Sequence, residues 1–280
     1  MQSLANPTES VPLPDPGSRT NRFGNILAIS SLVIKELSRR KDFYVLFILT
    51  ALVTLVMASA NFFSVEHVSR YLREICLFLI WVSSLVIAVV TTARQIPAER
   101  ENRTLFPLLA KPVTRNDVVL GKFLGCWLAT GLTLVVFYFF LGLIGCLRDH
   151  HWPIGNHFQA LVLHWFMIGI VCALSVLASV ILAAPSSTNT IVLIVAAAIL
   201  LVGRHLNKVA VGLVEPGQTI VYSLYYVLPH LELFDLRDLV IHDWPLVRWP
   251  IFGAAVGYAL VYITLFLSAA CLAFRRKPIH

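Results

Sequence analysis

Six long apolar runs alternate with polar segments along the chain. A helix crosses a bilayer core of about 30 Å with roughly 20 apolar residues, and about 17 to 25 is the usual range. Each run meets or nearly meets this length, so each is predicted to be a membrane-spanning helix. The runs cover residues 43–63, 75–93, 123–147, 158–184, 188–203 and 249–274.

The fifth run is the shortest of the six and ends at Arg204 and His205, whose polar side chains can reach a membrane interface. A hairpin that enters and leaves on one side is the alternative interpretation of the fourth and fifth runs. The segment 206–248 is the longest extracytoplasmic loop of this arrangement, and it is rich in aromatic and acidic residues. We expect half-inserted helices there, with contact to substrate or a periplasmic partner as the alternative.

Residues 23–41, before the first run, have the pattern of an amphipathic helix. One helical face carries Ser31, Lys35 and Arg39, and the other is apolar: Phe23, Ile26, Leu27, Val33, Ile34 and Leu37. This pattern predicts a helix lying in the headgroup layer, and a plain cytosolic helix is the alternative. Residues 1–22 are polar and rich in proline, so we expect a flexible cytoplasmic tail without a secretory signal.

Composition agrees with a membrane protein. The 280 residues are 58% hydrophobic and only 13% charged, whereas soluble domains carry about 25% charged residues. An all-helical integral membrane protein is therefore predicted, and a disordered protein, a disulfide scaffold and an ordinary cytosolic enzyme are excluded. The five cysteines all lie in apolar runs without a paired motif, as small buried residues do.

The distribution of charge predicts the orientation. With the N-terminus in the cytoplasm and six crossings, cytoplasmic segments hold 15 of the 22 Lys and Arg residues but only 7 of the 15 Asp and Glu residues. Loops rich in Lys and Arg stay inside. We therefore expect both termini in the cytoplasm of a bacterium, with the spans in its inner membrane and residues 275–280 as a basic tail. The same asymmetry explains the basic pI, so no nucleic-acid partner is needed.

The loop between the second and third runs, residues 94–122, is too polar for lipid and contains signals for two helices. Pro97 suits the first turn of a short helix, with Glu99 and Glu101 near its N-terminal end. Thr114 to Asp117 resembles a capping box that opens the helix of the third span. A short helix with both charged and leucine side chains suits docking in a groove of another protein, and a solvated loop is the alternative.

The residues of this loop resemble those of type-2, exporter-like ABC transporter permeases. The resemblance rests on Glu99, Glu101, Thr104, Leu105, Leu108, Leu109, Lys111, Pro112, Val113, Arg115, Gly121 and Lys122. The preceding amphipathic helix is similar in kind and place. The segment 224–237, LYYVLPHLELFDLR, resembles the branch linked to multicopper-enzyme maturation. Arg103, where many members have Gly, and Pro107, which interrupts the helix, depart from the pattern.

The resemblance implies a six-span permease domain, residues 23–274, that works as a dimer with a separate ABC ATPase subunit. That ATPase would bind ATP-Mg and dock on Glu99, Glu101, Thr104, Leu105, Leu108 and Arg115. The residues agree that hydrolysis belongs to another chain. A phosphate-binding loop needs Ser or Thr after its Gly-Lys, and here Phe123 follows Lys122. We therefore expect neither a catalytic residue nor a bound cofactor on this chain.

Two further groups of residues are weaker candidates for sites. His150, His151 and His157 surround the loop after the third run, where they could bind copper or zinc, and anchoring of helix ends in the headgroups is the alternative. The pairs Gly121 with Gly125 and Gly253 with Gly257 have the spacing that lets membrane helices approach closely. Because Ala254 and Ala255 keep its surface flat, the second pair is the preferred candidate for a helix contact.

Two other classes of function stay open on the residues alone. An intramembrane enzyme needs paired acids, a metal set or a nucleophile with its base at membrane depth. Every acidic residue lies outside the six runs, and His164 is the imidazole expected inside one. A membrane scaffold without transport is the other class. A neighbouring gene for a stand-alone ATPase would favour transport over both.

Overall fold

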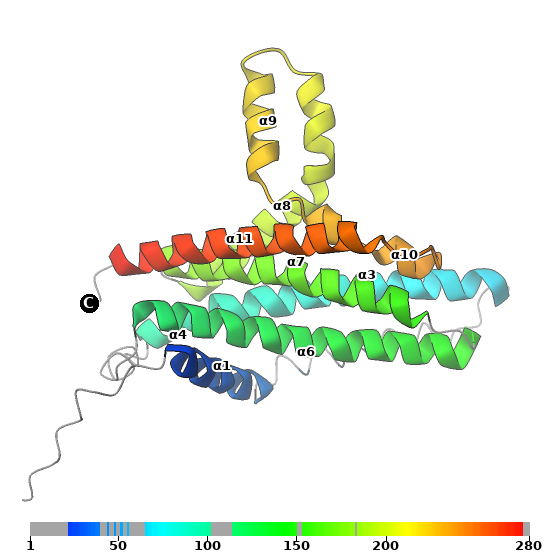
Figure 1. Ribbon diagram of the computed structural model, residues 1–280, viewed down its shortest axis with the longest axis horizontal. Coiled ribbons are helices and arrows are strands. Elements are labelled where there is room, and N and C mark those ends of the chain that lie inside the picture. The colour runs from blue at the N-terminus through cyan, green and yellow to red at the C-terminus, as the bar shows by residue number, and fades with distance from the viewer. Residues whose placement is uncertain are drawn as a thin grey trace, which may run out of the picture.

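The computed structural model describes residues 22–39, 44, 48, 51, 52, 55, 65–101, 114–149, 153–182 and 184–276. Every regular element within these ranges is a helix, so the predicted all-helical fold is confirmed (Figure 1). Five of these helices are long and apolar enough to cross a membrane. They correspond to the second through sixth predicted spans. Most of the first predicted span, 43–63, lies outside the described residues.

Four long helices run lengthwise beside one another and form the body of the molecule (Figure 1). They are α3 (Val65–Ala93), α6 (Arg115–Asp149), α7 (Ile154–Ile181) and α11 (Trp249–Arg276). Helix α7 contacts the other three and holds the centre of the core. A helix that is apolar on all sides is stable only when it is surrounded, and Met167, Ile168 and Cys172 of α7 are fully buried.

Helix α1 (Arg22–Ser38) forms where the amphipathic helix was predicted, and part of its predicted apolar face is buried. It packs along α6 and buries Ile29, Val33 and Leu37, whereas Phe23 and Leu27 are 71% and 47% exposed. The predicted apolar face thus includes the buried Val33 and Leu37 together with the exposed Phe23 and Leu27. Ile29 and Val33 are buried where they meet two glycines of α6. The location of α1 in the headgroup layer stays a prediction.

Helix α8 (Pro185–Val211) is longer than the fifth predicted span. Proline at its first position has a backbone angle already suited to a helix. The helix does not end near Arg204 and His205 but continues to Val211, because α9 (Gly217–Val227) packs against this extension. The end of α8 and α9 together project from the bundle as a hairpin (Figure 1).

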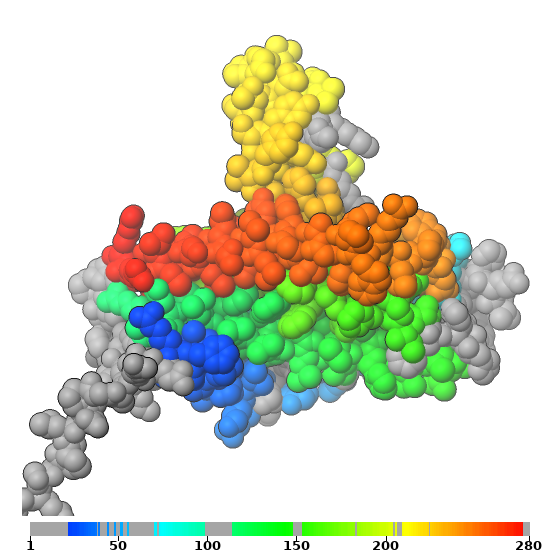
Figure 2. All heavy atoms as spheres, in the orientation of Figure 1, coloured from blue at the N-terminus to red at the C-terminus, as the bar shows by residue number. Residues whose placement is uncertain are grey.

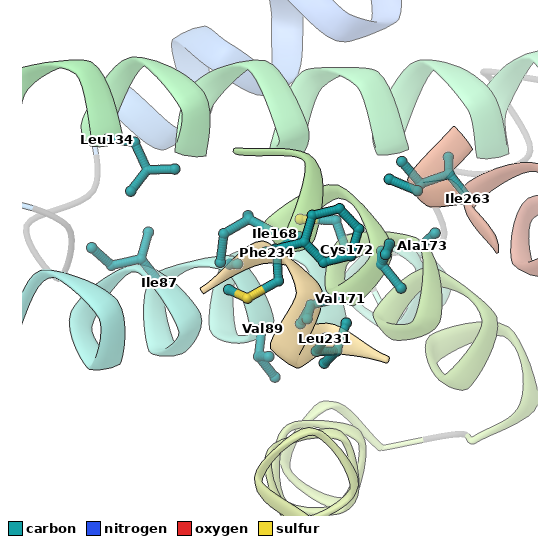
Figure 3. Packing of buried hydrophobic residues seen from close by; sticks show 14 of the residues in the cluster. Ile87, Val89, Leu134, Ile168, Val171, Cys172, Ala173, Leu231, Phe234 and Ile263 are labelled. Atoms are coloured by element: carbon teal, nitrogen blue, oxygen red, sulfur yellow. The ribbon is translucent and has the colours of Figure 1, made fainter. Parts of the chain in front are cut away.

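The chain re-enters the bundle after this hairpin. A short 3-10 helix, η1 (Leu231–Phe234), packs against α7 and α8, and α10 (Arg237–Ile241) packs against α3 and α7. Leu231 and Phe234 are 2% and 1% exposed, and Figure 3 shows them among core residues of α7 near the middle of that helix. A segment predicted as part of an extracytoplasmic loop thus contributes to the core.

Candidate coupling site

One end of the bundle joins the start of α6, the end of α11 and a short helix, α4 (Gln95–Glu101). We call it the α4 end. The opposite end, which carries α10, is the α10 end. Hydrogen bonds and close contacts at the α4 end fix the positions of the three helices there.

A capping box begins α6, as predicted. The Asp117 carboxylate accepts a hydrogen bond from the backbone N–H of Thr114 at 3.0 Å, and the Thr114 hydroxyl accepts one from the backbone N–H of Asp117 at 3.3 Å. Two N–H groups that lack partners in the first turn are satisfied in this way. The start of a helix of 35 residues, roughly 52 Å long, is thereby held in one conformation.

Arg115 connects the start of α6 to the end of α11. Its Nη1 donates to the carbonyl oxygens of Phe274 at 3.1 Å and of Arg275 at 3.4 Å, and its guanidinium lies 5.9 Å from the centre of the Phe274 ring. Arg275 in turn donates from Nε to Asn116 Oδ1 at 3.2 Å. The last carbonyls of a helix have no partner within it and carry partial negative charge. A cation placed there stabilises the end of α11.

The first turn of α4 lies inside the bundle. Gln95 and Ile96 are 4% and 1% exposed, and Lys122 of α6, also 4% exposed, donates from Nζ to Gln95 Oε1 at 3.0 Å. Burial of an ammonium group is costly unless its donors find acceptors. The Lys122–Gln95 hydrogen bond therefore makes the position of α4 depend on that of α6.

Helix α1 touches α6 at Gly121 and Gly125. A Cβ atom added at Gly121 would lie 2.7 Å from Cβ of Ile29, and one added at Gly125 would lie 2.6 Å from Cβ of Val33. Both distances are shorter than any real contact between such atoms. The two helices approach this closely only because both positions lack a side chain. The first glycine pair thus forms a helix contact within the chain.

The comparison with known families identifies the family of the chain. Residues 51–278 match the protein family described as ABC-2 family transporter protein. This chain belongs to the ABC-2 transporter family. No curated protein matches it significantly. The match confirms a multi-pass membrane permease subunit of an ABC transporter, a transport component rather than an enzyme, and it includes α4, α6 and α11 but not α1. The multicopper branch stays a prediction.

The predicted docking residues of this ABC-2 permease fall into three groups. Arg115 is described, and its guanidinium bonds within the chain. Glu99 and Glu101 lie in the second half of α4, and the positions of their side chains are outside the described part of the structure. The remaining three lie wholly outside the described residues: Thr104, Leu105 and Leu108. Docking on these residues stays a prediction.

The histidine and glycine candidates have different surroundings. His150 and His151 lie outside the described residues, and Nδ1 of His157 lies 3.0 Å from the Pro153 carbonyl oxygen. Within the described ranges, no group of three metal-binding side chains comes together. Gly253 and Gly257 lie on the exposed side of α11, where an added Cβ would meet nothing within 4 Å among the described residues. Their predicted helix contact stays a prediction.

The α10 end of the permease holds an ion pair that sequence reasoning missed. Arg237 donates from Nε and Nη2 to the two carboxylate oxygens of Asp235, both at 2.8 Å, and its guanidinium lies 5.0 Å from the centre of the Trp81 ring. The hydrogen bonds that Arg237 donates to Asp235 raise the pKa of Arg237 above its ordinary value, so the guanidinium stays charged. The signal was two opposite charges within an apolar stretch, LELFDLR.

A buried polar cluster continues inward from this ion pair. Trp81 lies beside His164, with ring centres 5.8 Å apart. Nε2 of His164 lies 2.9 Å from the Ser84 hydroxyl, and Nδ1 lies 3.3 Å from the Tyr138 hydroxyl. Because both ring nitrogens have partners, the histidine predicted inside a span is a satisfied contact among α3, α6 and α7.

Proposed function

We propose that this permease couples ATP hydrolysis on a separate ABC ATPase subunit to movement of its own spans. The ATPase would bind ATP-Mg and dock on the second half of α4, together with the residues that follow it. The observation that carries this proposal is the burial of the first turn of α4. Because the Gln95 side chain is hydrogen-bonded to Lys122, a displacement of α4 would be transmitted directly to α6.

The neighbouring contacts extend this movement to other helices. Arg115 links the start of α6 to the end of α11, and the glycine contact links α6 to α1. A displacement of α4 would therefore move α6, α11 and α1 together as packed rods, which is how small shifts at a contact become rearrangements of a bundle. A ligand shifts a protein toward the state that it binds more tightly. ATP would in this way close the ATPase, and that closure would supply the energy for the movement.

The complex we propose contains two permease copies and two ATPase subunits. In this arrangement the α4 end faces the cytoplasm of a bacterium, both termini lie on that side, and the spans cross the inner membrane. The exposed side of α11, with Gly253 and Gly257, would receive the second copy. Small residues on a membrane helix allow this kind of close approach, and Figure 2 shows α11 forming one uncovered side of the body.

Charge reversal on α4 tests the docking. The double variant Glu99→Lys with Glu101→Lys is expected to lower co-purification with the ABC ATPase subunit of the proposed complex, roughly tenfold or more, because complementary charge fixes such contacts. ATP hydrolysis stimulated by the permease in liposomes should fall in parallel. Glu215→Lys, an exposed position between α8 and α9, is the matched control and should change neither measurement. Unchanged assembly and unchanged hydrolysis in the double variant would refute the docking role.

A labelling experiment tests the orientation independently. In a variant whose native cysteines are replaced by serine, a cysteine is introduced at Glu101. A membrane-impermeant maleimide should react with it in inverted membrane vesicles, whose cytoplasmic side faces out, and not in intact cells. Reaction in intact cells would place α4 on the wrong side for an ATPase.

A further inference from the structure

Two tryptophans face each other between α6 and α7. Trp127 lies on α6 and Trp165 on α7, and their stacked rings have centres 4.8 Å apart with planes inclined by 24°. Each tryptophan is followed four residues later by a glycine, Gly131 on α6 and Gly169 on α7. Residues four apart lie on the same face of a helix, so each helix presents the same pair to its neighbour. We call these four residues the tryptophan clasp.

The two indoles exchange hydrogen bonds with the facing backbones. Nε1 of Trp127 donates to the carbonyl oxygen of Trp165 at 3.0 Å, and Nε1 of Trp165 donates to the carbonyl oxygen of Trp127 at 3.1 Å. Both helices are long and apolar enough to cross a membrane, and the bilayer core offers no water to satisfy an N–H group. The contact is therefore reciprocal: each tryptophan is both donor and acceptor toward the other.

The glycines let each indole reach the opposite backbone. A Cβ atom added at Gly169 would lie 2.8 Å from Nε1 of Trp127, and one added at Gly131 would lie 2.8 Å from Cε2 of Trp165. Both distances are shorter than any real contact between such atoms. A larger residue at either position would push the facing indole away from the carbonyl that it binds. Small residues allow close approach between membrane helices, and here the group that approaches is an aromatic ring.

The clasp joins α6 and α7 far from the loop that connects them. Trp127 lies 22 residues before Asp149, the last residue of α6, which is about 33 Å along the helix axis. The chain links the two helices beyond that end, through residues 150–153. Figure 1 shows α6 and α7 running beside one another along the body. Two attachments this far apart oppose both sliding and rotation of one helix against the other.

We infer that the tryptophan clasp makes α6 and α7 a single rigid body, with Trp127 and Trp165 as positioning residues. Helix α7 holds the centre of the core and contacts α3, α8 and α11. A displacement of α6 would carry α7 with it and so reach the core, because packed rigid helices transmit movement between distant parts of a protein. This last step rests on the proposed function, in which α4 moves α6. The rigidity of the pair requires no ATPase.

Distances between spin labels test the inference on the full chain in phosphatidylcholine nanodiscs. In a variant whose native cysteines are replaced by serine, labels are attached at Leu120 of α6 and Ile181 of α7, two positions that are at least partly exposed. Double electron–electron resonance should give one narrow distance distribution. The double variant Trp127→Phe with Trp165→Phe keeps two aromatic rings but removes both donors. It should at least double the width of the distribution.

Further variants separate the rigidity of the pair from general stability. Trp244→Phe removes an exposed tryptophan outside the clasp, and Gly125→Ala disturbs the contact of α6 with α1. Neither should change the width, even where Gly125→Ala lowers the thermal midpoint of unfolding. Gly131→Ala and Gly169→Ala leave both indoles in the chain, yet each should broaden the distribution, because the added methyl group displaces the facing ring.

Thermal stability gives an independent measurement of the reciprocity. The two tryptophans share one stacking contact and both hydrogen bonds. Trp127→Phe and Trp165→Phe should therefore lower the thermal midpoint of unfolding by similar amounts. The double variant should lower it by clearly less than the sum of the two, since residues in direct contact are coupled.

Three outcomes would overturn the inference. They are an unchanged distribution in the double tryptophan variant, equal broadening by Gly125→Ala, and additive losses of the thermal midpoint. Should the double variant fail to fold, as shown by gel filtration, Gly131→Ala and Gly169→Ala decide in its place. A change of the distance between the labels when the ATPase subunit and ATP are added would also count against a rigid body. Loss of ATPase docking with an unchanged distribution would count against the proposed function alone.

Discussion

Gly125 is the residue at which α1 approaches α6 most closely, and the contact has a measurable consequence. Gly125→Ala adds a Cβ at 2.6 Å from Cβ of Val33, so α1 must move away. Overpacking of this kind costs about 1–3 kcal/mol. We expect a lower thermal midpoint of unfolding in detergent, measured by circular dichroism. Gly257→Ala is the control, because its added Cβ meets nothing within 4 Å; equal destabilisation by both would show that the α1 contact is unimportant.

The hydrogen bond between Lys122 and Gln95 is the second feature at this scale. Gln95→Leu removes an acceptor from a buried ammonium group, a loss that costs about 1–3 kcal/mol, whereas Lys122→Met removes the charge together with its need for acceptors. We therefore expect Gln95→Leu to destabilise the protein more than Lys122→Met does. The double variant should be more stable than Gln95→Leu alone, because the two sites are coupled. Additive losses in urea unfolding would exclude this coupling.

At the scale of elements, local sequence patterns predicted the structure well where the interacting residues are close together in the sequence. The capping box at Thr114 and Asp117 formed as expected, since its partners are three residues apart. The buried face of α1 was not predictable from α1 alone, because Gly121 and Gly125 of a distant helix select it. The insertion of η1 was also missed: its short apolar stretch has no helical period, and only contacts with α7 and α8 hold it.

The candidate site shows the same division. The start of α6 followed from its capping residues, and a short helix that contains Pro97 was also predicted. The prediction that Glu99 and Glu101 lie near the N-terminal end of this helix was wrong, because α4 begins at Gln95 and its first turn holds no acidic residue. The Arg115 contact with the last carbonyls of α11 joins residues 159 positions apart, and no spacing rule connects them. Arg115 was assigned to ATPase docking because its place in the loop resembled that of the family. A charged residue near a loop can bind either a partner subunit or another helix of its own chain. The packing of the whole chain decides between the two.

The link between α6 and α11 gives a prediction for these elements. Arg115→Ala removes a cation from the last turn of α11, and the loss of about 1 kcal/mol in hydrogen bonding should speed amide exchange in residues 270–276 roughly fivefold. Arg276→Ala, an exposed arginine of the same turn, is the control and should leave exchange there unchanged. If Arg115→Ala weakens ATPase binding without altering exchange, its role is docking and not the linking of helices.

For the whole molecule, the uncovered side of α11 makes a prediction about assembly. Gly253, Gly257, Val261 and Ser268 are exposed along this side, and no described residue fills the space beside the two glycines. Two such faces would pack closely at small residues. In a background without native cysteines, Val261→Cys should form an intermolecular disulfide in membranes on mild oxidation. Leu132→Cys, on the exposed side of α6, should not.

A bulky residue at the centre of the same face decides whether the disulfide reports a specific contact. Gly257→Leu, combined with Val261→Cys, should lower the yield of crosslinked dimer several-fold, because the leucine side chain separates the two helices. It should leave the stability of the single chain unchanged, since that side chain has space in the isolated permease. Crosslinking that is indifferent to Gly257→Leu would reflect random collision in the membrane. A second copy would then have to bind another surface, and Gly253 and Gly257 would serve only as lipid-facing positions of α11.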